Sequence, residues 1–362
     1  MENRRIGVLV VEDSLLFRSL LVKCIDACPD LMVVGVAADP FEARDRIIEC
    51  RPDVMTLDVE LPRMNGIEFL KKLMPQYPVR TVVISALNDK VFDAMKAGAV
   101  DFLAKPIATD RNKLNEFLQT ELPAAIRIAA KARIGKNLTV MSAAPIKATQ
   151  LAGAGLLPGT DASRELLVAI GASTGGTEAT SAVLDKFGSD MPGIVITQHM
   201  PEGFTAMYAG RLKQQLAGRL TVSEAVSGEK ILPGHVYIAP GGDRHMEVIR
   251  KGSNYYIQLT ALDKVNGHRP SVDVLFNSVA AAAGSNAVGI ILTGMGGDGA
   301  QGLLNMRRCG ARTIGQDEST CVVYGMPKVA YEKGAVEFQE KLGDIPGRTY
   351  YLLEKMQKRK EM

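Results

Sequence analysis

The sequence contains no tryptophan, and aromatic residues make up only 5% of its 362 positions. Proteins that bind single-stranded nucleic acid stack bases on aromatic side chains, so this scarcity argues against such a function. The net charge is only +3, from 43 Lys and Arg against 40 Asp and Glu. A nearly balanced charge without a basic recognition helix lacks the electrostatic footprint of a DNA- or RNA-binding protein. We therefore expect no nucleic-acid partner.

Long hydrophobic runs are missing too. The apolar stretch at 6–11 ends at Glu12 and Asp13, which makes it too short for the core of a signal peptide. No run approaches the ~20 residues that span a bilayer. The five cysteines are scattered, and no histidine lies near the close pair Cys24 and Cys28. Reduced thiols fit this pattern better than disulfides or a zinc site. We expect a cytoplasmic protein with no segment inserted in a membrane.

The length of the chain exceeds one compact core and suits two domains. Residues 135–164 contain no aromatic side chain and are rich in Ala, Gly, Ser and Thr. Such a composition is typical of a flexible linker, and a random coil of this length spans roughly 30 Å. We predict a first domain over 1–134, this linker, a second domain over 165–350 and a C-terminal tail over 351–362.

The first domain alternates apolar runs with amphipathic segments. Five runs have the length of short strands, and a longer helical pattern at 110–134 is interrupted near Pro123. Strand–helix units in this order predict a five-stranded, doubly wound parallel sheet. Ligands of such sheets bind at the carboxyl ends of the strands. The predicted strands are 6–11, 31–37, 54–57, 81–84 and 100–103.

Polar residues gather at these strand ends. Glu12 and Asp13 follow the first strand, and Asp58 ends the third. Three carboxylates in one crevice repel each other unless a hard cation lies among them, and Mg²⁺ fits oxygen ligands. Ser85 ends the fourth strand and Lys105 follows the fifth, which would suit a phosphoryl group on Asp58. Each residue alone could be a solvated loop charge, but five at five strand ends point to a site.

These motifs resemble a response-regulator receiver domain. The likeness lies in LVVEDS at 9–14, PDVMTLDVELP at 52–62 and KP at 105–106. One departure is Glu12, where many receivers have Asp; the longer side chain keeps the charge. The resemblance implies a chemotaxis histidine kinase as phosphodonor. It also implies roles for six residues: Asp58 as phospho-acceptor, Glu12, Asp13 and Asp58 as Mg²⁺ ligands, Ser85 and Lys105 in contact with the phosphoryl group, and Phe102 as switch aromatic.

The second domain centres on GASTGG at 171–176. An apolar run at 166–170 precedes it and a helical pattern at 177–187 follows, so Ser173 lies at a strand–turn–helix bend. Its G-x-S-x-G spacing fits a nucleophile elbow. A phosphate-binding loop would need Lys where Thr177 stands, and a dinucleotide fingerprint would need Gly in place of Ser173. A glycine-rich turn without chemistry remains open on spacing alone.

A nucleophilic serine needs a base, and the chain has four histidines. His199 ends the strand-like run 194–198, so it shares the carboxyl edge of the sheet with Ser173. His235 precedes a strand, His245 lies in a predicted hairpin turn, and His268 lies in a loop before a helix that includes 272–279. Placement makes His199 the candidate base.

The candidate acid is Asp298. It lies in TGMGGDG at 293–299, after a strand at 288–292 and before a helix from about residue 300. Three strand ends would then supply Ser173, His199 and Asp298, and triads are defined by geometry rather than chain order. On spacing alone, a phosphate-binding turn explains this glycine-rich loop equally well.

The second domain resembles the catalytic domain of the chemotaxis protein-glutamate methylesterase (CheB) family. The motifs are GASTGG at 171–176, QHMP at 198–201, HRPSVD at 268–273, LTGMGGDG at 292–299, QDE at 316–318 and CVVYGMPK at 321–328. The resemblance implies an α/β parallel-sheet serine hydrolase whose esterase needs no cofactor. It implies five site residues: Ser173 as nucleophile, His199 as base, Asp298 as orienting acid, Thr174 lining the site and the Met295 N–H serving the oxyanion.

The joined resemblances imply a phosphorylation-activated hydrolase. It would remove methyl esters from glutamates of chemoreceptors, releasing methanol, and the family also includes deamidation of receptor glutamines. In that family the unmodified receiver covers the active site. The rival interpretation is a response regulator whose second domain only binds a partner, which would leave the placement of Ser173, His199 and Asp298 as coincidence.

Overall fold

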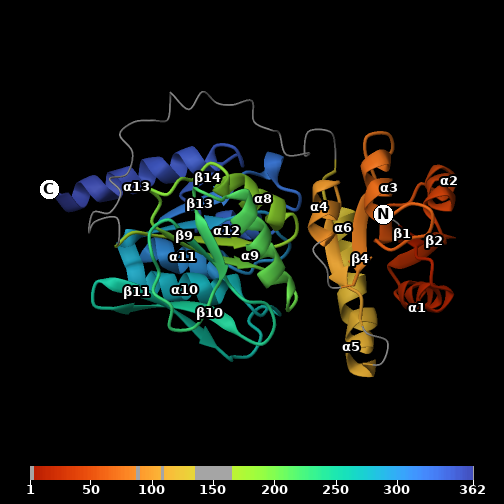
Figure 1. Cartoon of the computed structure of the whole chain (residues 1–362), viewed down its shortest axis with the longest axis horizontal. Coiled ribbons are helices and arrows are strands. Elements are labelled where there is room, and N and C mark those ends of the chain that lie inside the picture. The colour runs from red at the N-terminus through yellow and green to blue at the C-terminus, as the bar shows by residue number, and fades with distance from the viewer. Residues whose placement is uncertain (1–3, 87–89, 107–109, 135–164, 362) are drawn as a thin grey trace. The chain divides into compact units, whose positions relative to one another are not determined.

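The computed structural model describes residues 4–86, 90–106, 110–134 and 165–361 (Figure 1). The chain divides into two compact units, Met1–Thr139 and Val140–Met362. The predicted linker at 135–164 lies outside the described residues. Among the helices that the structure describes, none has both the length and the apolar character needed to cross a bilayer.

The first unit contains a five-stranded sheet with the order β2-β1-β3-β4-β5, in which every pairing is parallel. This confirms the predicted doubly wound fold. The central strands β1 (Ile6–Val11) and β3 (Val54–Asp58) are almost completely buried. Continuous apolar runs of this kind are typical of parallel strands covered on both faces. The other elements are α1 (Leu15–Asp26), β2 (Leu31–Ala37), α2 (Pro40–Cys50), α3 (Gly66–Leu73), β4 (Arg80–Ser85), α4 (Lys90–Lys96) and β5 (Asp101–Ala104).

The helix predicted at 110–134 has three parts. It begins as α5 (Arg111–Glu116), continues as the π-helical segment η1 (Phe117–Glu121) and ends as α6 (Leu122–Lys131). Pro123 lies in the first turn of α6, where a missing N–H costs little. The predicted interruption is therefore a change of helix type just before Pro123, with no break in the helix.

The second unit contains a seven-stranded parallel sheet with the order β14-β13-β12-β6-β7-β9-β8. Its central strands are β12 (Ala287–Ile291), β6 (Leu167–Ala172) and β7 (Gly193–Gln198), and all three are fully buried. The remaining strands are β8 (Thr221–Glu224), β9 (His235–Ile238), β13 (Arg312–Gln316) and β14 (Phe338–Glu340). The helices of this unit include α8 (Gly176–Leu184), α9 (Phe204–Gln215), α11 (Ala300–Arg308), α12 (Met326–Glu332) and α13 (Ile345–Glu361). Two short 3-10 turns are η3 (Gly284–Asn286) and η4 (Glu318–Thr320).

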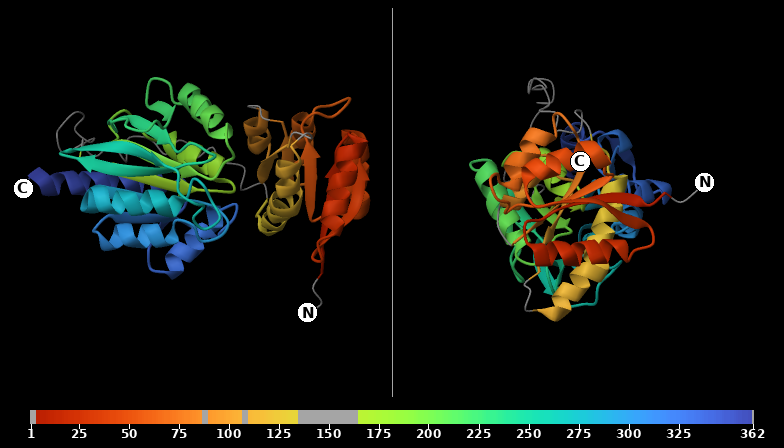
Figure 2. Two further views of the ribbon diagram at one scale, coloured as in Figure 1. Left: turned by 90° about the horizontal axis from the view of Figure 1, so that it is seen from below. Right: turned by 90° about the vertical axis from the view of Figure 1, so that its right-hand side faces the viewer.

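One buried helix, α10 (Val272–Ala283), organises the core of this unit. Figure 2 shows α10 between α11 and an antiparallel hairpin made of β10 (His245–Lys251) and β11 (Asn254–Thr260). Its apolar side chains recur at helical spacing, as the sequence predicts, and Val272, Phe276 and Val279 are completely buried. The helix therefore joins the hairpin to α11 in the core of this unit.

His245 is not in a turn, which corrects the sequence prediction. It is the first residue of β10, pairs with Thr260 of β11 and is completely buried. Its Nε2 lies 2.9 Å from the carbonyl of Asp263, and its Nδ1 accepts the backbone N–H of Ser271 at 3.1 Å. Because the ring is held by two backbone groups, it joins the hairpin to the start of α10.

The predicted boundary at residue 350 also needs correction. It falls inside α13, which continues to Glu361. Leu352 and Leu353 beyond that boundary are completely buried. Residues 351–361 therefore extend a helix of the second unit and do not form a separate tail.

Gly171 in β6 permits the close approach of α10. A Cβ atom at this position would lie 2.1 Å from Cγ1 of Val272 and 3.1 Å from Cζ of Phe276. We expect Gly171→Ala to lower the free energy of unfolding by about 1–3 kcal/mol, because buried side chains must move. The measurement is the midpoint of denaturant unfolding. In Gly210→Ala, the matched control in α9, the new Cβ meets nothing within 4 Å, so stability should rise by about 0.5–1 kcal/mol. Equal midpoints for the two variants would contradict the tight packing.

Candidate active site

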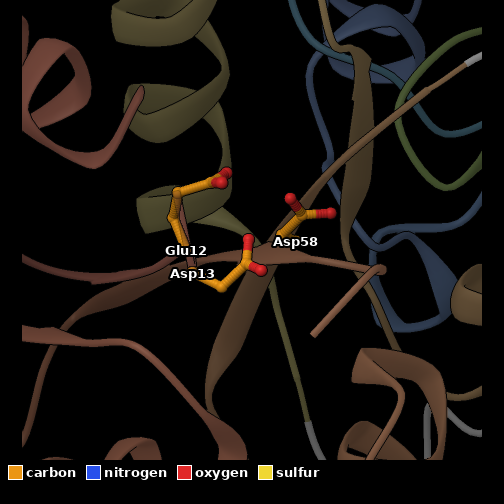
Figure 3. A group of neighbouring side chains, drawn as sticks. All are labelled: Glu12, Asp13 and Asp58. Carbon is orange, nitrogen blue, oxygen red and sulfur yellow. The ribbon is translucent and has the colours of Figure 1, made fainter. Parts of the chain in front are cut away.

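Three carboxylates meet at the carboxyl edge of the first sheet. Glu12 and Asp13 follow β1, and Asp58 ends the neighbouring strand β3. Figure 3 shows the three side chains gathered there, and their oxygens lie within 4.8 Å of one another. Glu12 and Asp58 are buried, whereas Asp13 is exposed. Hard oxygen donors open to solvent on one side fit a small divalent cation that keeps some of its waters.

Lys105, which follows β5, supplies a positive charge to this cluster. Its Nζ lies 2.9 Å from Oε2 of Glu12 and 2.5 Å from Oδ2 of Asp58. Burial is the main cause that raises the pKa of Glu12 to about 7; the hydrogen bond from Lys105 opposes this rise and the charge of Asp58 adds to it. Although burial alone would lower it, hydrogen bonds to the two carboxylates hold the pKa of Lys105 above its ordinary value. The cluster thus combines three carboxyl groups with the positively charged side chain of Lys105.

Ser85 and Phe102 lie on the strands next to this cluster. Ser85 ends β4, is completely buried, and its carbonyl accepts the backbone N–H of Lys105 at 2.7 Å. Phe102, in β5, is 7% exposed, and its ring lies edge-on to that of Phe92 with 6.3 Å between centroids. Ser85 is therefore beside the lysine, and Phe102 is packed inward.

In the second unit, three adjacent strands end in candidate catalytic residues. Ser173 directly follows β6, His199 directly follows β7, and Asp298 lies in the loop between β12 and α11. Backbone hydrogen bonds tie these loops together: Ser173 N–H donates to Thr293 at 3.0 Å, and His199 N–H donates to Ala172 at 3.1 Å. The structure brings the three loops to one sheet edge, as their sequence positions predicted.

The turn at Ser173 depends on glycine. Gly175 has φ = 73° and directly precedes α8, which has no side-chain cap, so the chain can reverse within two residues of the serine. On the neighbouring loop, a Cβ atom at Gly294 would lie 2.7 Å from Cβ of Ser173. The strand-to-helix bend and the missing side chain at Gly294 together let the two loops approach closely.

Asp298 and His199 form a buried pair. Oδ2 of Asp298 lies 2.8 Å from Nε2 of His199, and Asp298 is only 2% exposed. The carboxylate also caps α10, because it accepts the backbone N–H of Val272 at 2.7 Å and that of Asp273 at 3.2 Å. Two side-chain donors complete its shell: Ser271 Oγ at 2.7 Å and Asn266 Nδ2 at 2.9 Å.

These donors keep Asp298 ionised. Burial alone would raise the pKa of Asp298, but the hydrogen bonds from His199, Asn266 and Ser271 outweigh it and hold the pKa far below its ordinary value. Since Nε2 of His199 is occupied by Asp298, the other ring nitrogen is the one left for chemistry. That nitrogen, Nδ1, is buried and has no hydrogen-bond partner among the described residues.

His268, which the sequence placed in a loop before a helix, contacts the candidate base. Its ring stacks on that of His199, with 3.7 Å between centroids and an angle of 9° between planes. Burial, followed by the charge of His199, lowers the pKa of His268 to about 4. His268 is therefore neutral at physiological pH. The signal that could have placed it is the preceding Asn266-Gly267 pair, a strong indicator of a tight hairpin turn.

Gln198 is a second residue whose part in the site was not predicted. It is 2% exposed, and its Nε2 donates to the carbonyl of Ser173 at 2.9 Å and to that of His199 at 3.2 Å. One amide thus fixes the backbone of two candidate catalytic residues. No sequence pattern predicts a side chain that bonds two carbonyls on different loops.

The two remaining candidates lie close by. Thr174 is buried, and its carbonyl accepts the hydroxyl of Thr293 at 3.0 Å. Met295 is partly exposed and directly follows Gly294, the residue packed against Ser173. Both therefore lie on loops that border the nucleophile position.

Comparison with known proteins gives two family matches. The CheB methylesterase family model matches residues 168–349, which include Ser173, His199 and Asp298. The response regulator receiver domain model matches residues 8–118, which include the acidic cluster and Lys105.

Full-length relatives resemble the chain over nearly its whole length. A protein-glutamate methylesterase/protein-glutamine glutaminase 2 of Syntrophomonas wolfei is 52% identical, covering 98% of this chain and 100% of the relative. A protein-glutamate methylesterase/protein-glutamine glutaminase of Bordetella parapertussis is 49% identical, covering 95% and 96%. One of the same name from Syntrophotalea carbinolica is 46% identical, covering 97% and 98%.

Proposed function

The chain belongs to the CheB methylesterase family and carries a response-regulator receiver domain, and from this premise we propose that Ser173, His199 and Asp298 perform its ester hydrolysis. It is a protein-glutamate methylesterase and protein-glutamine glutaminase of chemotaxis. The observation that carries the proposal is the buried 2.8 Å contact between Asp298 and His199, which lie in the loops after the two strands that flank the strand of Ser173. A nucleophile, a base and an orienting acid need this order of contact.

The reaction follows from these positions. Nδ1 of His199 takes the proton of the Ser173 hydroxyl, and Oγ attacks the carbonyl carbon of the glutamate methyl ester. The tetrahedral oxyanion collapses, and methanol leaves with the proton returned by His199. Water then repeats the same steps on the acyl-enzyme and releases the glutamate carboxylate. Asp298 stays ionised and stabilises the imidazolium in both halves. A glutamine amide would follow the same path with ammonia as leaving group.

Two further residues complete this proposed site. The backbone N–H of Met295 serves the oxyanion, and Thr174 lines the pocket beside Ser173. Their loops border the serine, which supports these roles. A preorganised donor at an oxyanion contributes a few kcal/mol, commonly about 3, to the lowering of the barrier.

In the receiver domain, Asp58 is the proposed phospho-acceptor. Glu12, Asp13 and Asp58 would hold Mg²⁺, which offsets the charge of the incoming phosphoryl group. The mutual distance of their oxygens and the partly open position of Asp13 support this ligand set. Lys105 and Ser85 contact the phosphoryl group, and Phe102 changes its packing in response. A chemotaxis histidine kinase supplies the phosphoryl group, and phosphorylation raises the esterase activity.

The proposed substrates are methylated glutamates of chemoreceptors, and the proposed compartment is the cytoplasm. Five free cysteines support that compartment, since exposed Cys309 and its half-buried counterparts would be oxidised in a secreted protein. We propose domain limits of 1–134 for the receiver and 165–361 for the esterase, with the second limit moved to the end of α13.

Labelling with a fluorophosphonate tests the serine mechanism directly. We expect covalent modification at one residue, Ser173, because only a serine with an adjacent base is a strong nucleophile. Mass spectrometry of the labelled chain identifies the site. Ser181→Ala, a change on the adjacent helix α8, should still be labelled, and Ser173→Ala should not. Failure of the chain to react in the presence of a phosphodonor would refute the proposal and favour a second domain that only binds a partner.

A further inference from the structure

Asp298 has a second acidic side chain as a direct neighbour. Asp273, in the first turn of α10, is 7% exposed, and its backbone N–H contacts Oδ1 of Asp298 at 3.2 Å. Burial, and then the charge of Asp298, raises the pKa of Asp273 against the hydrogen bond that it accepts from Gly302. Two carboxylates so close disfavour each other's ionised forms. Yet Asp298 must remain ionised to stabilise a protonated His199.

The side-chain amide of Asn266 lies between these two carboxylates. Its Nδ2 donates to Oδ2 of Asp273 at 2.7 Å and to Oδ1 of Asp298 at 2.9 Å. An asparagine amide has two N–H groups, so each carboxylate receives one of them. Hydrogen bonds to charged groups stabilise the charged form, and here one neutral side chain stabilises two anions at once.

A tight turn places Asn266 there. Val265 and His268 exchange two backbone hydrogen bonds of 3.1 and 3.0 Å. Between them, Asn266 has φ = 54° and Gly267 has φ = 81°, which is the backbone of a type I′ turn and explains the Asn-Gly pair. The turn ends at His268, whose ring stacks on His199. One short segment therefore contacts both Asp298 and His199.

We propose that Asn266 is a positioning residue of the esterase, whose amide separates Asp273 from Asp298 and so holds Asp298 as the ionised partner of His199. The inference rests on the proposed catalytic role of Asp298. It gives a role to the segment before α10. Ester hydrolysis by the three catalytic residues alone does not explain why this segment contacts both Asp298 and His199. It also predicts that charge, as well as shape, matters at position 266.

Asn266→Asp is the decisive change, because it keeps the shape and replaces two donors by a third carboxylate. The titratable groups that interact with Asp298 are His199, Asp273 and His268, and Lys264 interacts with His268. Methanol release by the full-length chain should show kcat lower by roughly tenfold to a hundredfold with little change in KM, as for a misplaced catalytic group. The acid limb of the pH–rate profile should move to higher pH, because added negative charge favours the protonated forms of Asp298 and His199.

Three further variants separate charge from folding. Asp273→Asn removes the neighbouring charge and should move the acid limb to lower pH. The double variant Asn266→Asp with Asp273→Asn has two carboxylates again and should recover part of the lost kcat. Asn277→Asp is the matched control on α10: its Oδ1, which accepts from Asn305 at 2.8 Å, is retained, so kcat and the pH profile should stay unchanged.

A wild-type kcat and pH profile in Asn266→Asp would overturn the proposal. If that variant fails to fold, Asp273→Asn decides, and an unmoved acid limb there overturns it as well. Asp298→Asn, measured in parallel, separates the two levels of inference. An active Asp298→Asn enzyme refutes the catalytic role of Asp298, whereas an inactive one beside a normal Asn266→Asp enzyme refutes only the role of Asn266.

Discussion

Ser173→Ala is expected to reduce methanol release from methylated receptor membranes by roughly 10⁴- to 10⁶-fold, with the fold unchanged. The alanine leaves no oxygen to attack the ester, and the remaining catalysis comes from binding and oxyanion donors alone. His199→Ala should cost a similar factor, because the serine then has no base. The double variant should be about as inactive as either single one, since the residues act as a unit. If the loss of activity in the double variant equalled the product of the two single losses, the two residues would not act in one shared step.

Asp298 is better tested by Asp298→Asn than by alanine. The carboxylate also caps α10, and loss of a helix cap costs about 1 kcal/mol in the free energy of unfolding, so alanine would mix two effects. Asparagine keeps the shape and an acceptor oxygen but removes the charge that stabilises the imidazolium. We expect a loss of roughly 10⁴-fold in kcat and a smaller fall of the unfolding midpoint than alanine would cause, because one acceptor oxygen is kept. Near-normal turnover would remove Asp298 from the triad.

The second large effect concerns activation. In Asp58→Asn, a small phosphodonor should leave methanol release at its unphosphorylated level, because an amide cannot form the acyl phosphate. The unaltered chain should respond strongly, since a bias of about 1.4 kcal/mol toward the active state already changes its ratio to the inactive state tenfold. The measurement is initial rate with and without phosphodonor at fixed Mg²⁺.

Asp45→Asn provides the matched control for that prediction. Asp45 is exposed on α2, is paired with Arg44 and is not part of the acidic cluster, so this variant should be activated normally. EDTA should abolish activation of the unaltered chain and leave its basal rate intact, because the proposed metal serves only the receiver. Activation that persists in Asp58→Asn would show a different acceptor, and a basal rate lost to EDTA would contradict a metal-free esterase.

The sequence predicted the fold well because the central strands are short, buried apolar runs that are followed by polar residues. Since parallel strands share one carboxyl edge, residues predicted at strand ends were expected at the same edge, and Asp298 and His199 are in contact there. His245 shows the limit of such reasoning. The glycine-rich segment before it resembles a hairpin turn. The residue instead begins a strand, and its buried ring is held by hydrogen bonds to two backbone groups.

The surroundings of the candidate pair, Asp298 and His199, were harder to predict. Gln198 and Asn266 each bond two groups on different loops, and such contacts depend on the complete fold. His268 was ranked below His199 because its loop position said nothing of what its ring would touch. The local sequence did contain one informative pattern, the Asn-Gly pair. It predicts a tight turn, and that turn positions both Asn266 and His268 beside the candidate pair.

Because Asp298 caps α10, the position of its side chain can be followed through the exchange of two backbone amide hydrogens. The amide hydrogens of Val272 and Asp273 are held by this carboxylate, so they exchange with solvent deuterium only when Asp298 moves away. Their exchange rates therefore report how often Asp298, the proposed orienting acid, leaves its place, in the absence of substrate and without a probe attached to the chain. A ligand or modification that tightens the site slows these two amides, and one that loosens it speeds them, at single-residue resolution.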